Sequence, residues 1–122
     1  FGLILTEGFF DVAKLVEADC RNVVALMGSA ISSEQIERLV WVHARVQFPR
    51  ILLFLDRDSA GQRGVQQARE RLSAHGLSVT VFDWDQLAPF NDQEAEPIPE
   101  SIKDPADMSV EQLRMLRRQG IL

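Results

Sequence analysis

Acidic residues stand directly behind the apolar runs of this chain, where they could act together on a cation or a phosphate. Glu7 follows the first run, and Asp11 comes four residues later, about one turn into the next helix, so it can face the same side. Asp56 and Asp58 follow the third run. If the first and third runs form neighbouring parallel strands, these four carboxylates converge at the carboxyl edge of the sheet, where such sheets bind ligands.

Two further acids, Asp104 and Asp107, lie three residues apart beyond the fourth apolar run and could join the same cluster. Several carboxylates at close range either hold protons through raised pKa values or bind a cation. Mg²⁺ prefers oxygen ligands and typically binds one or two carboxylates together with phosphate oxygens. Two such ions can clamp the attacking and leaving oxygens of a phosphoryl transfer. The acids therefore predict a magnesium site, with Mn²⁺ as a substitute ion.

Simpler roles for these acids remain open from the residues alone. Glu7 and Asp11 would also favour a helix N-terminus through the helix dipole, and Asp58 would serve as an N-cap, which is compatible with metal binding. Asp104 and Asp107 would also suit an acidic loop that caps the last helix.

Three glycines stand at the same edge of the expected sheet. Gly8 and Gly61 allow the backbone to turn sharply from strand to helix, and Gly28 allows close approach of a phosphate. Together with Arg57, these three glycines are the candidate phosphate-binding residues. Gly28 would equally serve as a plain turn residue.

The elements that must position these residues alternate along the chain. Apolar runs indicate strands over residues 3–5, 23–27, 51–55 and 79–82. Helical spacing fills the gaps between them, and capping boxes at Ser32 and Ser109 open two of the helices. The proline-rich stretch before Ser109 is expected to be a loop. This order predicts an α/β domain with a mostly parallel four-stranded sheet flanked by helices.

Length and composition suit one globular domain spanning residues 1–122. The chain is 46% apolar and 25% charged, and its longest apolar run is far too short to cross a bilayer. Its net charge of −5 argues against a free-standing binder of the nucleic-acid backbone. The single cysteine, Cys20, fits a reducing compartment. The chain opens at Phe1 within an apolar pattern, which predicts a piece of a longer protein.

Four segments together resemble the Toprim domain, which is shared by bacterial DnaG-type primases, topoisomerases, OLD-family nucleases and RecR-type repair proteins. The segments are Thr6-Glu7-Gly8-Phe9-Phe10-Asp11, Gly28-Ser29, Asp56-Arg57-Asp58-Ser59-Ala60-Gly61 and Lys103-Asp104-Pro105-Ala106-Asp107. Their order and spacing look most like the primase branch, over about residues 3–110. The resemblance implies a three-layer, Rossmann-like α/β fold.

The resemblance also implies roles for the acids. Glu7 would be the Toprim glutamate, a metal ligand or general acid/base, and Asp56 and Asp58 would be catalytic metal ligands. Asp11, Asp104 and Asp107 would support the metal cluster. The chain departs from the family pattern at two places. Arg57 occupies a position where many primases have glycine, and it is expected to touch phosphate or a neighbouring acid. The last segment is Asp-Pro-Ala-Asp rather than Asp-Pro-Asp.

These expectations combine into one function. The chain would be the magnesium-binding catalytic domain of a primase-like nucleotidyltransferase that supports RNA primer synthesis in DNA replication, in the cytoplasm. Its partners would be nucleic acid, nucleoside triphosphates and the basic and zinc-binding modules that this chain lacks, so the isolated chain would be inactive. The alternatives are a metal-dependent nuclease, or a non-catalytic module that binds a nucleotide or a partner.

Overall fold

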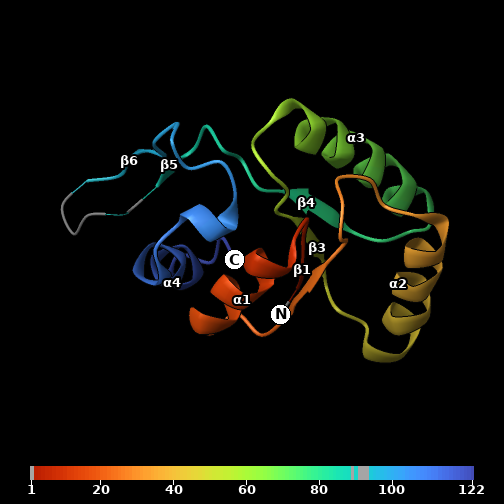
Figure 1. Cartoon of the computed structure of the whole chain (residues 1–122). Helices are drawn as coiled ribbons and strands as arrows, with labels where there is room; N and C mark the ends of the chain where they lie inside the picture. The colour runs from red at the N-terminus through yellow and green to blue at the C-terminus, as the bar shows by residue number, and fades with distance from the viewer. Residues whose placement is uncertain (1, 89, 91–93) are drawn as a thin grey trace.

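The computed structural model describes residues 2–88, 90 and 94–122. Phe1, and with it the opening of the chain within an apolar pattern, lies outside the described residues. So does Pro89 of the proline-rich stretch. Figure 1 shows a sheet between two pairs of helices, with a segment on one side that carries the last helix.

A parallel sheet of four short strands forms the centre of the fold. The strands are β1 (Leu3–Thr6), β2 (Val23–Ala25), β3 (Ile51–Leu53) and β4 (Val79–Val81), in the order β2-β1-β3-β4. Every neighbouring pair is parallel, and Leu5 is in register with Leu53 on β3. The predicted fold class is therefore confirmed, and β1 and β3 are neighbours as the convergence of the acids requires.

Four helices cover the two faces of this sheet. They are α1 (Phe9–Glu17), α2 (Ser33–Val46), α3 (Ser59–Ala74) and α4 (Val110–Arg118). α1 and α4 pack on one face, and α2 and α3 pack on the other (Figure 1). Both predicted capping boxes are confirmed, because Ser32 and Ser109 each accept from the backbone of a glutamine three residues later, and that glutamine's side chain accepts in return.

Two apolar clusters hold the layers together, one on each face of the sheet. Successive residues of β1 supply both, because Ile4 packs with Leu15 of α1 and Leu113 of α4, whereas Leu5 packs with Leu39 of α2. All five side chains are at least nine-tenths buried. None of the helices in the described residues is long and apolar enough to cross a membrane.

The segment between β4 and α4 is more structured than the expected loop. It contains a short antiparallel pair, β5 (Leu87–Ala88) and β6 (Glu96–Pro97), and a 3₁₀ turn, η1 (Pro105–Asp107). Trp84, Ile98 and Ile102 are buried in the cluster shared with α1 and α4. These apolar side chains anchor the segment to the core, so the expectation of a plain loop was wrong here.

Candidate metal centre

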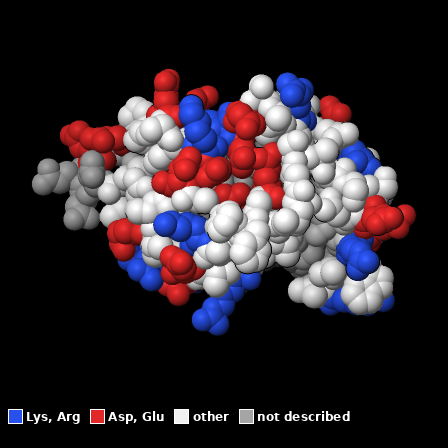
Figure 2. All heavy atoms as spheres, viewed as in Figure 1, with Lys and Arg blue, Asp and Glu red and all other residues white. Residues whose placement is uncertain are grey.

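An open hollow of about 680 Å³ lies at the carboxyl end of β1 and β3. The main chains of the two strands stay paired up to its edge, where the Phe54 N–H donates to the Leu5 carbonyl at 2.8 Å. The acids in its lining are Glu7, Asp11, Asp56, Asp58, Asp104 and Asp107. Figure 2 shows acidic atoms gathered in the middle of the face turned toward the viewer. The structure thus brings all six predicted acids to one hollow.

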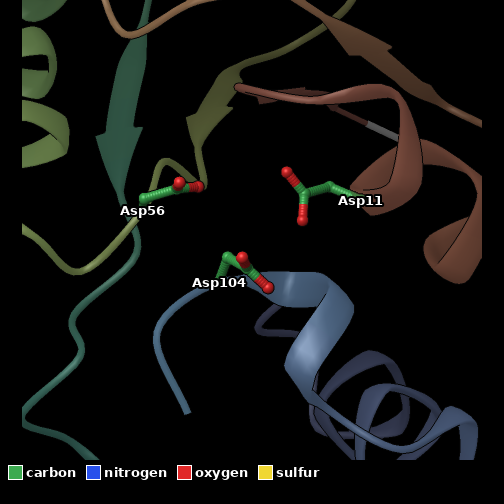
Figure 3. A group of neighbouring side chains, drawn as sticks. All are labelled: Asp11, Asp56 and Asp104. Atoms are coloured by element: carbon green, nitrogen blue, oxygen red, sulfur yellow. The ribbon is translucent and has the colours of Figure 1, made fainter.

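Three of these acids form the tightest group. One carboxylate oxygen from each of Asp11, Asp56 and Asp104 lies within 4.8 Å of the other two. In Figure 3 the three carboxylates point toward a common space from separate parts of the chain. Asp11 comes from α1, Asp56 from the turn after β3, and Asp104 from the start of η1. Ligand atoms that converge in this way suit a single cation with oxygen ligands.

Asp11 is held in place by the main chain of its own first turn and by the main chain of η1. Its Oδ2 accepts from the Gly8 N–H at 3.1 Å, within the first turn of α1, and its Oδ1 accepts from the Ala106 N–H at 3.0 Å. The side chain is only 5% exposed. Asp104 in turn caps η1, because its Oδ1 accepts from the Asp107 N–H at 2.9 Å. These bonds fix the orientation of two carboxylates of the group.

Asp56 presents the atom that most needs a partner. Its Oδ1 is buried and has no hydrogen-bond donor among the described residues. Such an orphaned oxygen costs free energy unless a proton or a cation satisfies it. Burial, the neighbouring Glu7, and Asp104 raise the pKa of Asp56 to about 8. The residues present therefore fit a divalent cation, whose charge would compensate this group of carboxylates.

The other two acids of the group are shifted in the same direction. Burial raises the pKa of Asp11 to about 6, against the lowering effect of its bonds from Gly8 and Ala106. Burial also raises the pKa of Asp104 above its usual range. Without a cation, the group therefore retains protons at pH values where exposed aspartates are fully ionised.

We expect the metal-free chain to lose stability as the pH rises from 5 to 9. Asp11 and Asp56 titrate near 6 and 8 when folded but near 3.8 when unfolded, so the unfolded chain releases their protons first. Their stabilising contribution is complete below pH 4 and disappears as the pH passes 6 and then 8. After allowance for solvent screening, the loss should be on the order of 2 kcal/mol. Urea unfolding at several pH values, with a chelator, measures it. A flat profile would contradict this expectation.

Glu7, Asp58 and Asp107 line the hollow outside the tight group. Asp58 is the N-cap of α3, where its Oδ1 accepts from the Gly61 N–H at 2.7 Å. Asp107 Oδ2 accepts from the Lys103 N–H at 2.9 Å. The simpler capping role of Asp58 is therefore present, and its role as a metal ligand, like those of Glu7 and Asp107, stays a prediction.

The residues expected to contact phosphate fall into two groups. Gly8 and Gly28 line the hollow, whereas Gly61 and Arg57 are not part of its lining. Gly61 allows a close approach, since a Cβ there would lie 2.1 Å from the Asp56 carbonyl oxygen.

The Arg57 side chain is turned toward the segment before η1. Its guanidinium donates to the carbonyls of Pro99 at 2.9 Å and Ile98 at 3.3 Å, and also reaches those of Ile102 and Trp84 at 3.4 Å. The Arg57 N–H donates to the Lys103 carbonyl. Arg57 also lies 4.0 Å from the acid Asp85, which is not part of the hollow. In this structure Arg57 fastens the chain that leads to Asp104.

Residues that received no role from the sequence also line the hollow, among them Phe10, Met27 and Ala106. In the sequence, Phe10 lies between the predicted acids Glu7 and Asp11, and its side chain is 78% exposed. It falls off the apolar stripe of α1 formed by Val12 and Leu15, and that signal was available in the sequence. The left-handed backbone of Met27, with φ of 62°, had no such signal.

Together, the fold and the site define a class of protein. It is a doubly wound α/β domain with clustered carboxylates at the carboxyl edge of its sheet. The family model described as the Toprim domain matches residues 2–83. The chain belongs to the Toprim family, which confirms the resemblance.

Its relatives include bacterial DNA primases. The chain is 38% identical over 86 residues to the DNA primase of Mycoplasma pneumoniae, which covers 70% of this chain and 14% of that protein. It is 37% identical over 80 residues to the DNA primase of Staphylococcus aureus strain COL, covering 66% and 12%. The chain thus spans about an eighth of the length of these relatives, and it is a primase-like Toprim module.

A solved structure agrees with this assignment. The crystal structure of the zinc-binding and RNA polymerase domains of Aquifex aeolicus primase superposes with a TM-score of 0.63 and 26% identity. The match covers 96% of this chain and 25% of that chain. It extends beyond the family match at residue 83, so it includes most of the segment that carries Asp104.

Proposed function

We propose that this chain is the metal-binding half of a nucleotidyltransferase active site, which supports RNA primer synthesis within a longer, primase-like protein. The observation that carries the proposal is the group of Asp11, Asp56 and Asp104, with a buried Asp56 oxygen that has no hydrogen-bond donor in the described part of the chain. The relatives described above are DNA primases, which favours primer synthesis over the nuclease alternative.

The roles of the acids follow from their positions. Asp56, Asp11 and Asp104 would hold Mg²⁺, which when bound supplies positive charge to phosphate oxygens during the transfer. Glu7, beside Asp56, would accept the proton of the attacking hydroxyl or act as a further ligand. Asp58 and Asp107 would complete the ligand set at the rim of the hollow. Gly8 and Gly28 would allow phosphate oxygens to approach the main chain.

The other parts of the active site, including the template-binding surface, would come from other segments of the longer protein. Residues 1–122 would act as one Toprim domain of a cytoplasmic replication protein. A basic module would hold the template, and a zinc-binding module would accompany it. Because the chain carries a net charge of −5, we expect no primer synthesis from the chain by itself, even with template, nucleotides and Mg²⁺ present. Primer synthesis by the isolated chain would contradict this expectation.

The metal site can be tested by NMR on the isolated chain. Trace Mn²⁺ should broaden the amide signals of residues 7–11, 56–61 and 104–107, and excess Mg²⁺ should reverse the broadening. Glu37→Gln, at an exposed position on α2, is the matched control and should broaden in the same pattern. Weak broadening spread over the exposed acids of residues 94–100, and none around Asp56, would contradict the proposal.

A further inference from the structure

The hollow that holds the carboxylates also has an apolar wall. Phe10 comes from the start of α1 and Met27 from the turn after β2, and Gly28 and Ala60 of α3 also line the hollow. Phe10 is 78% exposed and Met27 is 73% exposed, so neither side chain contributes to the core. Other large apolar side chains are exposed as well, but these two meet at the polar hollow, where apolar surface suits a ligand.

The backbone of Met27 is an independent sign that this wall is built for a purpose. Met27 has a φ of 62°, in the left-handed region that non-glycine residues rarely adopt. Its N–H donates to the Glu7 carbonyl at 2.8 Å, which ties the strained turn to the first of the site acids. The left-handed residues Asp19 and Gln47 stand at helix ends, whereas Met27 lines the hollow, and strained residues cluster at ligand sites.

A ligand that fills both walls must combine two chemistries. One part must chelate a cation held by carboxylates, as phosphate oxygens do. The other part must offer a flat apolar face to an exposed aromatic ring and a thioether, as a nucleobase does. The volume of about 680 Å³ lies within the range of small-molecule sites.

We infer that Phe10 and Met27 form a stacking shelf for the base of a nucleoside triphosphate whose phosphates lie at the metal centre. The inference rests on the proposed function and adds to it the residues that contact the base. Phe10 supplies the ring face, and Met27 adds a thioether to the same wall. Base stacking on an aromatic ring tolerates all four bases, so the shelf contributes affinity rather than sequence preference.

The test compares two triphosphates, one with a nucleoside and one without. Adenosine triphosphate and inorganic triphosphate, each with Mg²⁺, are titrated into the full chain and followed by NMR. We expect adenosine triphosphate to bind roughly tenfold more tightly, as one stacked base contributes. Phe10→Ala should remove most of that advantage and leave the affinity for inorganic triphosphate unchanged.

Two further variants sharpen the result. Met27→Gly relieves the left-handed strain, so it should fold at least as well as the parent chain while losing part of the base-dependent affinity. Trp41→Ala removes another exposed aromatic, which lies on α2 and does not line the hollow, and should change neither affinity.

The possible failures are distinct. If neither triphosphate binds the parent chain, both the proposed function and the stacking shelf are overturned. If both ligands bind and Asp56→Asn abolishes binding, but Phe10→Ala leaves the tenfold difference intact, only the shelf is overturned. The shelf alone is also overturned if Phe10→Ala weakens the binding of a single-stranded oligonucleotide but not the binding of adenosine triphosphate.

Discussion

Asp56→Asn should make the metal-free chain more stable at pH 8 and remove its response to Mg²⁺. Asparagine carries no charge, so the substitution ends the repulsion from Glu7 and Asp104 that, with burial, raises the pKa of Asp56 to about 8. We expect a gain of about 1–2 kcal/mol in the free energy of unfolding, after allowance for solvent screening. Mg²⁺ at a hundred times its Kd should stabilise the parent chain by about 2.7 kcal/mol and the variant by almost nothing.

Urea unfolding at pH 8, with chelator and then with Mg²⁺, measures both effects. Glu37→Gln removes one negative charge from an exposed position on α2 and serves as the control. It should change neither the metal-free stability nor the response to Mg²⁺. An Asp56→Asn variant that is less stable than the parent chain without metal would show that Asp56 is a structural residue, and would remove the main support for a metal centre.

Gly64→Ala should unfold the domain or bring it close to unfolding. A Cβ at position 64 would lie 1.8 Å from the Ser29 carbonyl oxygen and 3.5 Å from a methyl of Leu55. The first atom belongs to the main chain and position 64 lies within α3, so either the helix or the turn at Ser29 must shift. Overpacking of a core usually costs 1–3 kcal/mol, and a backbone clash of this depth should cost about 3 kcal/mol or more.

Gly28→Ala is the matched control for this substitution. A Cβ at Gly28 meets nothing within 4 Å, so the change in unfolding free energy should stay within about 0.5 kcal/mol. The same variant also tests phosphate approach, because Gly28 lines the hollow. Thermal unfolding of both variants, monitored by circular dichroism, measures the difference in their stability. Equal melting temperatures for the two variants would contradict the close contact between α3 and the turn at Ser29.

Much of the fold was predictable because local patterns and global topology agree. Four apolar runs became the four strands, and the capping boxes at Ser32 and Ser109 start helices where the sequence placed them. The acids behind the first and third runs share one hollow because parallel strands end at the same edge. This convergence requires β1 and β3 to be neighbours, and the sequence alone did not determine the strand order.

The parts that escaped prediction depend on contacts between distant residues. The guanidinium of Arg57 reaches carbonyls more than forty residues along the chain, at Ile98 and Pro99. The pairing of β5 with β6 follows from the anchoring of that segment, not from any alternation in its own short strands. The left-handed residue Met27 is hydrogen-bonded to the carbonyl of Glu7 in a different element. None of these features leaves a periodic signal in the sequence.

The bond between Asp11 and the Ala106 N–H has a consequence for biosynthesis. It joins residues that lie 95 positions apart, whereas the sheet is complete at Val81. On a ribosome that delivers the chain from its N-terminus, the sheet and its first three helices can form while the third carboxylate of the group is still untranslated. The centre would then close only when η1 docks on α1. A nascent chain paused before residue 104 would thus lack one carboxylate of the group and the core residues that α4 supplies.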